Sequence, residues 1–583
     1  MPTLEWIGKS KVINHHQDVP FRVLERKYSF DENGQHNEDN GSENMIIRGD
    51  NLEALKALLP RYEGRVKCIY IDPPYNTGNE GWVYNDNVND PKIKKWLGEV
   101  VGKEGEDLTR HDKWLCMMYP RLKLLQKLLA DDGVIFISID DTEYANLKLI
   151  CDEIFGSNCF VSNISWQRTY STRNDSKGIV NEVEHLVVYS KLPDWNPNKL
   201  PRTAEMDAKY KNPDNDRTLW RTDNAFAPGA ATHQGMVYAI QHPFTGKMLY
   251  PSNGACWRYQ QDQMLEIMRG WCGYELRDLN DAHERAVVCG VPESDVRQGV
   301  QAIVLSESLE ISAQKAQAVY DRGQWPRFFF TKGGKGGIAR KTYLENVGGK
   351  LPTNFWAFTE TGHTDEAKKE MLAIFDGKAT FDTPKPHRLI EFVLKVAGNE
   401  NALILDSFAG SGTTAHAVLN MNKADGGHRK FILVEMMDYA DSITAERVKR
   451  VIRGYGEGKN AVEGTGGNFS FYDLGEPLLH GDVLNENVGV EKIREYVYFT
   501  DTKASLPESH PDEPYFMGVH IGSAYYFYYE KQAVTTLNRE FLHTVKTKAD
   551  SYVIYADLCT LSETELEKYH ITFKKIPRDI TKL

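Results

Sequence analysis

The residues Asp72-Pro73-Pro74-Tyr75 have the side-chain chemistry to hold a flat base that carries an amine. They follow the apolar run 66–71, which is typical of a buried strand, and the first proline ends that strand. The Asp72 carboxylate and the Pro73 carbonyl can accept both hydrogens of an exocyclic amine, while the Tyr75 ring can stack on the base. The alternative is an ordinary strand exit with a Pro-Pro turn, and the four residues alone leave both interpretations open.

A second stretch suited to ligand binding is Asp406-Ser407-Phe408-Ala409-Gly410-Ser411-Gly412-Thr413-Thr414, which follows the apolar run 402–405. A strand, an acid, a glycine turn and a helix start place backbone N–H groups around a ligand. Glu435 ends the next apolar run, 23 residues after Gly412, where an acid commonly binds ribose hydroxyls. The third glycine of G-x-G-x-x-G is missing, which favours a nucleoside without a pyrophosphate over a dinucleotide.

The pattern of apolar residues predicts the elements that position these two stretches. Residues 45–75 are typical of a strand–helix–strand unit, and a polar loop at 76–110 is long enough to be a functional lid. Further helices are expected at 113–129 and 141–155, and further strands at 134–139, 161–167, 183–190, 402–405 and 431–434. This alternation predicts an α/β fold with a doubly wound, mostly parallel sheet, whose carboxyl edge holds both stretches.

The alternation is interrupted between 196 and 380, which we interpret as an insertion. Within it, 327–350 is basic, with aromatic residues and glycines interspersed, and contains a single acid, Glu345. Such a segment is suited to contacting phosphates, although a solvated loop at a domain edge is the alternative. If the ligand is DNA, we predict that five basic residues of this segment contact it: Arg327, Lys332, Lys335, Arg340 and Lys341.

The remaining boundaries follow from composition. Residues 1–44 are interpreted as an N-terminal arm and a flexible, Gly/Asn-rich linker. The segments 45–195 and 381–480 form the two halves of the α/β domain. The tail, 481–583, contains expected strands at 523–529 and 551–556 and a helix at 562–568, so it is predicted to be a separate small α/β domain.

Composition excludes several classes of protein. No apolar stretch is long enough to span a membrane, and the eight cysteines include no C-x-x-C pair, so we expect a cytoplasmic protein without a metal site. The net charge of −12 means that nucleic acid must bind through a local basic face. No G-x-x-x-x-G-K-[ST] motif occurs, which excludes a nucleotide-driven motor of that type within this chain.

Short motifs along the chain occur in an order that is found in one protein family. They lie at 49–55, 72–78, 84–86, 114–115, 121–122, 383–386 and 406–414, and in the tail at 525–529, 555–557 and 575–580. On these motifs the chain resembles amino-methylating, S-adenosylmethionine-dependent DNA methyltransferases of the β class, in which the catalytic motif precedes the cofactor motif. It is most similar to the modification (Mod) subunits of type III restriction–modification systems. The similarity is weakest in 196–380, at the place where such enzymes carry target recognition.

The resemblance implies roles for individual residues. Asp72, Pro73, Pro74 and Tyr75 are implied to be catalytic. The implied cofactor-binding residues are Asp50, Asp72, Thr383, Lys385, Asp406, Phe408, Gly410, Gly412, Thr413 and Glu435. Glu435 is expected at the ribose, Asp50 near the adenine of the cofactor, and Thr383 and Lys385 at its carboxylate. For Asp50 a helix cap is the alternative role, and for Lys385 a plain surface position.

The resulting hypothesis is a site-specific methyltransferase that modifies N6 of adenine in duplex DNA by base flipping. The expected partners are double-stranded DNA, a second copy of the chain in a homodimer, and a restriction subunit with helicase and nuclease activity. Two alternatives stay open. The first is a cytosine-N4 or RNA amino-methyltransferase, and the second is a chain that acts chiefly in DNA recognition and assembly within a restriction complex.

Overall fold

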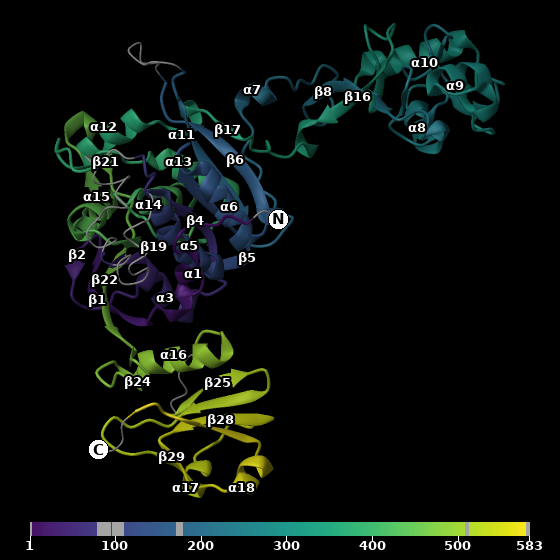
Figure 1. Cartoon of the computed structure of the whole chain (residues 1–583). Coiled ribbons are helices and arrows are strands. Elements are labelled where there is room, and N and C mark those ends of the chain that lie inside the picture. The colour runs from purple at the N-terminus through teal and green to yellow at the C-terminus, as the bar shows by residue number, and fades with distance from the viewer. Residues whose placement is uncertain (1–2, 78–94, 96–109, 171–178, 508–511, 579–583) are drawn as a thin grey trace. The chain divides into compact units, whose positions relative to one another are not determined.

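The structure is a computed structural model that describes residues 3–77, 95, 110–170, 179–507 and 512–578. The motif 84–86 and most of the predicted loop 76–110 lie outside the described residues. The chain divides into two compact units, which are considered separately below (Figure 1). The first comprises Met1–Asn198 and Pro352–Leu583, and the second comprises Lys199–Leu351.

The first unit is built on a mixed sheet, which has eleven strands in the described part of the chain. In spatial order these are β17 (Phe355–Trp356), β6 (Phe160–Gln167), β7 (Val183–Ser190), β5 (Leu129–Ile139), β4 (Val66–Ile71), β18 (Leu403–Asp406), β19 (Lys430–Glu435), β3 (Met45–Arg48), β22 (Phe469–Pro477), β1 (Arg22–Asp31) and β2 (Gly34–His36). The central strands from β5 to β22 are parallel, whereas β7 and β1 run antiparallel to their neighbours.

Helices cover both faces of this sheet. The helices are α3 (Asn51–Tyr62), α5 (Arg110–Leu128), α6 (Tyr144–Phe155), α13 (His387–Ala397), α14 (Thr413–Asp425) and α15 (Glu446–Arg453). Side chains of α3, α5 and α6 share one core with Ile69 and Ile71 of β4, while α13 contacts β4 and β5, and α14 contacts β19. Cys68 and Tyr70, which alternate with these isoleucines, are also buried, as expected for a strand covered on both faces. The predicted α/β fold with a mostly parallel sheet is confirmed.

Part of the N-terminal segment, residues 22–36, belongs to the sheet, which corrects its interpretation as an arm and a flexible linker over these residues. β1 pairs with β22 along most of its length, with Tyr28 opposite Phe471 and Ser29 opposite Ser470. A tight turn then leads to β2, which pairs back onto β1. The strand was missed because its residues, RVLERKYSFD, mix charged and apolar side chains without a clean alternation.

The predicted insertion, 196–380, ends too late. The second unit stops at Leu351, and the two residues of β17 pair with β6 in the main sheet. The helix α12 (Thr364–Ile374) also belongs to the first unit. A two-residue strand carries no periodic signal, which explains why the sequence does not mark this boundary.

The second unit, which we call the inserted unit, has its own aromatic core around Trp257, Trp271 and Phe328. The hairpin β15 (Phe328–Phe330) and β16 (Ile338–Tyr343) pairs with β8 (Trp220–Asn224). The other elements include β10 (Ile240–Gln241), β11 (Met248–Leu249), β13 (Tyr274–Arg277), β14 (Ala302–Leu305), α8 (Gln261–Arg269), α9 (Ala282–Cys289) and α10 (Leu309–Arg322).

The inserted unit is closed at its base by its own first and last residues. Leu200 N donates to Lys350 O at 2.8 Å, and Lys350 N donates to Leu200 O at 2.9 Å. The chain therefore enters and leaves this unit at one point.

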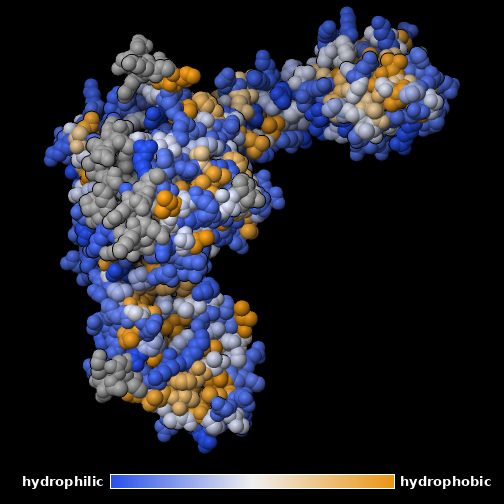
Figure 2. All heavy atoms as spheres, in the orientation of Figure 1, coloured by the Kyte–Doolittle hydropathy of each residue, from blue (hydrophilic) through white to orange (hydrophobic). Residues whose placement is uncertain are grey.

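The tail forms a small sheet of its own within the first unit. Its strands, in spatial order, are β25 (Phe516–His520), β26 (Ser523–Phe527), β28 (Ser551–Ala556) and β30 (Ile571–Lys575). The accompanying helices are α16 (Val490–Thr502), α17 (Arg539–Leu542) and α18 (Glu563–Lys568). Among the described residues, no helix is both long and apolar enough to cross a membrane. On the face drawn in Figure 2, hydrophobic residues are scattered among hydrophilic ones.

Candidate active site

The two predicted stretches meet at the carboxyl edge of the main sheet. β4 and β18 are parallel neighbours, with Cys68 paired to Ile404 and Ile69 to Leu405. From β4 the chain continues to β5 on one side, and from β18 to β19 on the other. Such a reversal of strand order opens a crevice at the strand ends, where α/β proteins bind ligands.

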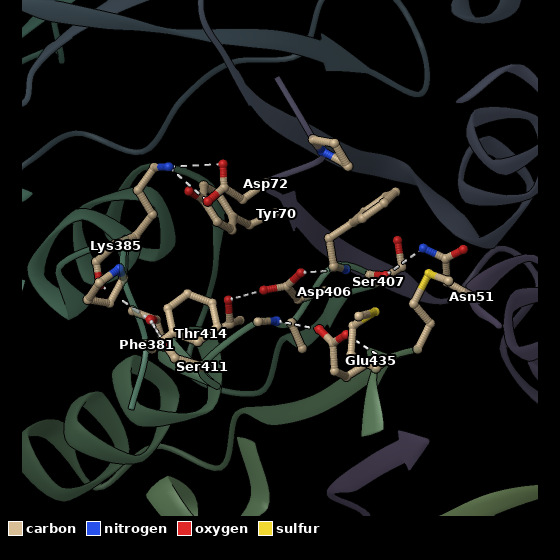
Figure 3. Close-up of a pocket in the computed structure, with 18 of the residues that line it drawn as sticks. Asn51, Tyr70, Asp72, Phe381, Lys385, Asp406, Ser407, Ser411, Thr414 and Glu435 are labelled. Carbon is tan, nitrogen blue, oxygen red and sulfur yellow. Dashed lines mark hydrogen bonds and ion pairs between the residues drawn. The ribbon is translucent and has the colours of Figure 1, made fainter. Parts of the chain in front are cut away.

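A pocket occupies this crevice (Figure 3). The predicted site residues that line it are Asp72, Pro74, Thr383, Lys385, Asp406, Phe408, Gly410, Thr413 and Glu435. Further lining residues include Asn51, Arg121 and Ser407, which lie in the predicted motifs but were given no role of their own, and Tyr70, Phe381 and Tyr439. Asp50, Pro73, Tyr75 and Gly412 are not among the lining residues.

Lys385 forms an ion pair with Asp72. The Lys385 ammonium nitrogen lies 2.9 and 2.8 Å from the two carboxylate oxygens of Asp72, as the dashed lines in Figure 3 mark. The same nitrogen donates to the Tyr75 hydroxyl at 2.9 Å. The Lys385 side chain is only 8% exposed, so the surface-lysine alternative is excluded. Its predicted contact with a cofactor carboxylate stays a prediction.

Tyr75 is buried and is held by its hydroxyl. This group donates to Glu184 Oε2 at 3.1 Å, in addition to accepting from Lys385, whose ammonium lies 5.0 Å from the ring centroid. Glu184 lies on β7, and Arg168 donates to its other oxygen at 2.8 Å. The sequence did not indicate Glu184, because nothing in its local pattern separates it from an ordinary strand residue.

The charges in this group are mutually stabilised. Burial raises the pKa of Asp72, and the Lys385 ammonium opposes that rise. Burial disfavours the charged form of Lys385, but Asp72 and Glu184 outweigh it and raise the pKa of the ammonium. For Glu184, burial is outweighed by Lys385 and Arg168, which lower its pKa. Glu184 and Lys385 are therefore charged at neutral pH.

The end of the Asp72 motif is fixed by a buried carboxylate. Asn76 has φ 59°, a left-handed conformation that asparagine tolerates better than most residues. Its side chain donates to Glu143 and, at 3.2 Å, to Arg110 O, while His111 Nδ1 lies 2.6 Å from the same Glu143 oxygen. Glu143 thus ties the residues on both sides of the segment 78–109 to each other.

The second stretch forms a tight loop between β18 and α14. Asp406 accepts from Phe408 N at 3.0 Å and from Thr414 Oγ1 at 2.6 Å, and burial raises the pKa of Asp406 to about 7. Gly412 has φ +83°, and a Cβ there would lie 2.9 Å from Thr444 O. Only glycine fits this position without displacing backbone.

Glu435 lies at the end of β19 and organises the opposite wall. Its two oxygens accept from Gly410 N at 2.8 Å and Met437 N at 2.9 Å. Burial raises the pKa of Glu435 to about 7. Nearby, Ser407 Oγ is buried and has no hydrogen-bond partner among the residues that the structure describes. The wall therefore offers a carboxylate and a hydroxyl to a polar ligand.

Asp50 has the capping role rather than a place in the pocket. Its carboxylate accepts from Leu52 N at 2.8 Å and Glu53 N at 3.4 Å at the start of α3, and it forms an ion pair with Arg121 at 3.2 Å. The neighbouring Asn51 lines the pocket and donates to Ser407 O at 3.0 Å. The expected contact of Asp50 with the adenine of a cofactor stays a prediction.

Arg447 of α15 is a further residue that the sequence did not indicate. One guanidinium nitrogen of this buried side chain donates to Ser411 Oγ at 2.9 Å and Thr413 Oγ1 at 2.8 Å. The other donates to Glu370 at 3.1 Å and His416 at 3.1 Å. Glu370, His416 and His387 are residue types that bind metals and lie close together, but Arg447 already directs its N–H groups at two of them.

The basic segment of the inserted unit is only partly accessible. Lys341 is fully buried, with its ammonium 2.5 Å from Asp214 and 2.6 Å from Asp216, so its predicted contact with DNA is wrong. Arg340 forms an ion pair with Asp223, and its side chain is only 17% exposed. The prediction that Arg340 contacts DNA therefore loses its basis. Arg327, Lys332 and Lys335 are exposed. Both lysines lie in the turn between β15 and β16.

Comparison with known proteins identifies the family of this chain. The family model described as "DNA methylase", which covers N6 and N4 methyltransferases, matches residues 66–446. The chain belongs to this family, as the motifs predicted.

Among individual relatives, the StyLTI Mod subunit of the type III restriction–modification enzyme of Salmonella typhimurium is 33% identical over 71% of this chain and 58% of its own length. The EcoPI Mod subunit of Escherichia phage P1 is 30% identical over 74% and 63%. The type II methyltransferase M.KpnI of Klebsiella pneumoniae is 30% identical over 68% and 81%. The chain thus spans less than two thirds of these two Mod subunits.

Proposed function

We propose that this chain transfers a methyl group from S-adenosylmethionine to N6 of adenine at a specific site in duplex DNA. One observation carries the proposal. The Asp72 carboxylate and the glycine loop with Glu435 line the same pocket, although they come from distant parts of the sequence. A carboxylate suited to binding an amine and a loop suited to binding a nucleoside therefore face the same pocket.

The pocket residues fit S-adenosylmethionine. The buried Glu435 carboxylate is suited to ribose hydroxyls. The Ser407 hydroxyl, which has no hydrogen-bond partner within the described part of the chain, offers a further polar contact. Phe408 and the backbone at Gly410 would hold the methionine part. Thr383 and the start of α13 would hold its carboxylate. When bound, this cofactor supplies an electrophilic methyl group.

The chain's own residues would activate the amine. The exocyclic amine of adenine is a weak nucleophile, because its lone pair is delocalised into the ring. A hydrogen bond accepted by Asp72, and a second accepted by the Pro73 carbonyl, would localise that pair on nitrogen. The amine becomes acidic only after methylation, so no strong base is needed beforehand. The adenine must leave the duplex to reach this pocket, because its amine is paired inside the helix.

Adenine is proposed as the target because the motif begins with aspartate, which resembles the adenine-directed branch of the family. The test is to incubate the purified chain with labelled S-adenosylmethionine and genomic DNA from a strain without methyltransferases. The DNA is then digested to nucleosides for mass spectrometry. N6-methyladenine is expected. N4-methylcytosine would overturn the target base, and the absence of any methylated nucleoside would overturn the enzymatic function.

Sequence recognition is proposed to lie in the inserted unit. It is a separate compact unit with exposed basic residues at the turn of a hairpin, which suits phosphate contacts. By analogy with the Mod subunits, we also propose a homodimer and a restriction subunit as partners. Exchanging residues 199–351 for those of a relative should change the methylated sequence and leave adenine as the target. Methylation of the original sequence would contradict this assignment.

A further inference from the structure

A buried carboxylate outside the Asp72 motif contacts two of the residues that surround Asp72. Glu184 is 6% exposed and lies on β7, which is separated from β4 by β5. Its Oε2 accepts the Tyr75 hydroxyl proton at 3.1 Å and lies 3.5 Å from the Lys385 ammonium nitrogen. Its Oε1 accepts from Arg168 at 2.8 Å.

Lys385 is therefore shared between two carboxylates. Its ammonium faces both oxygens of Asp72, the Tyr75 hydroxyl and Glu184, which together exceed its three N–H groups. The position of the ammonium between Asp72 and Glu184 thus depends on the charge of each. Arg168 balances Glu184 from the other side, since its guanidinium contacts the oxygen that Tyr75 does not use.

We propose that Glu184 is a positioning residue for methyl transfer, which holds the Lys385 ammonium and the Tyr75 hydroxyl so that the Asp72 carboxylate keeps a fixed orientation toward the target amine. The inference rests on the proposed function. Asp72 is the group that would touch the substrate, and Glu184 acts on it only through Lys385 and Tyr75.

The electrostatics support a role beyond packing. Among the residues that the structure describes, the charged and titratable groups that face Asp72 are Lys385, Glu184, Tyr75, Tyr70 and Asp406. Among them, Lys385 stabilises the ionised form of Asp72, whereas Glu184 opposes it. Removing the charge of Glu184 would leave Asp72 as the only charged carboxylate that the Lys385 ammonium contacts among the described residues. The pKa of Asp72 would then fall, while its orientation would be less constrained.

The experiment compares Glu184→Gln, Arg168→Gln and the control Glu182→Gln in the full-length chain. Glu182 precedes β7, and among the described residues no hydrogen bond or ion pair joins its side chain to these groups; only its backbone oxygen accepts from Arg168 N, and the substitution leaves that bond in place. The rate of methyl transfer to unmethylated genomic DNA is measured at saturating S-adenosylmethionine from pH 5 to pH 9. The dissociation constant for S-adenosylmethionine is measured by calorimetry.

For Glu184→Gln we expect a transfer rate about 10- to 100-fold lower, a change of less than about twofold in cofactor affinity, and an acid limb of the rate profile at lower pH. Arg168→Gln should move the acid limb the other way, because it removes a positive charge. The Arg168 side chain is 39% exposed, so Arg168→Gln is expected to fold. This variant therefore tests the role of Glu184 even if Glu184→Gln does not fold.

A Glu184→Gln rate and pH profile equal to those of Glu182→Gln would overturn the inference, as would an Arg168→Gln profile that does not move. These outcomes differ from failure of the proposed function, in which the unmodified chain itself transfers no methyl group to DNA.

Discussion

The Lys385 ammonium nitrogen lies within 2.9 Å of both carboxylate oxygens of Asp72. The ammonium thereby favours the ionised form of Asp72 at a position where burial raises the pKa of this carboxyl. The ion pair joins the two halves of the main sheet, since Asp72 follows β4 and Lys385 precedes α13. The amine-binding group and the cofactor side of the pocket are consequently coupled through one contact.

Asp72→Ala should abolish methyl transfer and leave the chain folded. Lys385 keeps Glu184 at 3.5 Å as a counter-charge, so the fold is not left with an isolated buried ammonium. Loss of the amine acceptor should lower the transfer rate by at least about 100-fold. Single-turnover transfer with labelled S-adenosylmethionine is the measurement, and calorimetry with the cofactor is the control for folding. Transfer near the rate of the unmodified chain would contradict the role of Asp72.

Tyr75→Phe should be clearly harmful, although the ring is retained. The hydroxyl accepts from Lys385 and donates to Glu184, and its removal leaves a buried acceptor with one donor fewer. The expected loss of stability is about 1–3 kcal/mol. Urea unfolding and the transfer rate should both report the change. If Tyr75→Phe matches the unmodified chain in both, the hydroxyl has no part in holding Lys385.

Arg447→Met should weaken the binding of S-adenosylmethionine without touching the ligand directly. The substitution removes the donors to Ser411 and Thr413 and leaves Glu370 without its guanidinium partner. Breaking a buried ion pair in this way costs about 3–5 kcal/mol. Calorimetry and thermal unfolding test both effects.

Arg450→Met, three residues further along α15, is the matched control. Arg450 is 32% exposed and pairs with Glu446 and Asp376 instead. Equal effects of the two substitutions would show that Arg447 has no special relation to the glycine loop.

The affinity for S-adenosylmethionine should fall as the pH drops below neutrality. Burial raises the pKa of Glu435 to about 7, so below that pH the group is protonated in the free protein. Binding of a cationic nucleoside favours the carboxylate, and the proton must therefore be released on binding. The dissociation constant should then rise by up to about tenfold per pH unit below 7.

Calorimetry at pH 6, 7 and 8 measures this dependence. Glu435→Gln should flatten it, leaving the part that belongs to Asp406, whose pKa burial also raises to about 7. An identical pH dependence in the unmodified chain and in Glu435→Gln would assign the proton to another group.

Lys332→Ala combined with Lys335→Ala should weaken DNA binding and flatten its salt dependence. Both side chains are exposed at the turn between β15 and β16. Each lost phosphate contact lowers the slope of log K against log salt by about 0.9. Fluorescence anisotropy with a duplex of mixed sequence at several salt concentrations is the measurement. An unchanged slope would remove these lysines from the DNA-binding surface.

Lys341→Met gives the contrasting result. Because this lysine is buried between Asp214 and Asp216, its loss should destabilise the inserted unit rather than change the salt slope. Limited proteolysis and thermal unfolding would detect the change.

The sequence predicts those parts of the site that depend on local order. Asp72, Asp406 and Glu435 each follow an apolar run, and the carboxyl ends of parallel strands necessarily meet at one edge. Glu184 and Arg447 could not be predicted in this way. Each acts by reaching residues that are remote in the sequence, and no periodic pattern reports such a contact.

For Lys341, the local sequence led to a predicted DNA contact that the structure contradicts. The density of basic residues in 327–350 suggested an exposed cationic surface, but the two aspartates that neutralise Lys341 occur more than a hundred residues earlier. Local charge counts do not include partners that only strand pairing brings together. The hairpin β15–β16 and its pairing with β8 create that neighbourhood.

The paired backbone of Leu200 and Lys350 makes the inserted unit a replaceable cassette. Two gene crossovers, one near the codon of each of these residues, would exchange the whole cassette. The two junctions would still lie side by side, joined by the same backbone hydrogen bonds. No strand of the main sheet would be cut by such an exchange, because β7 ends before the first junction and β17 begins after the second. Recombination between relatives therefore has a route to new combinations of the two units that leaves the Asp72–Lys385 pair intact.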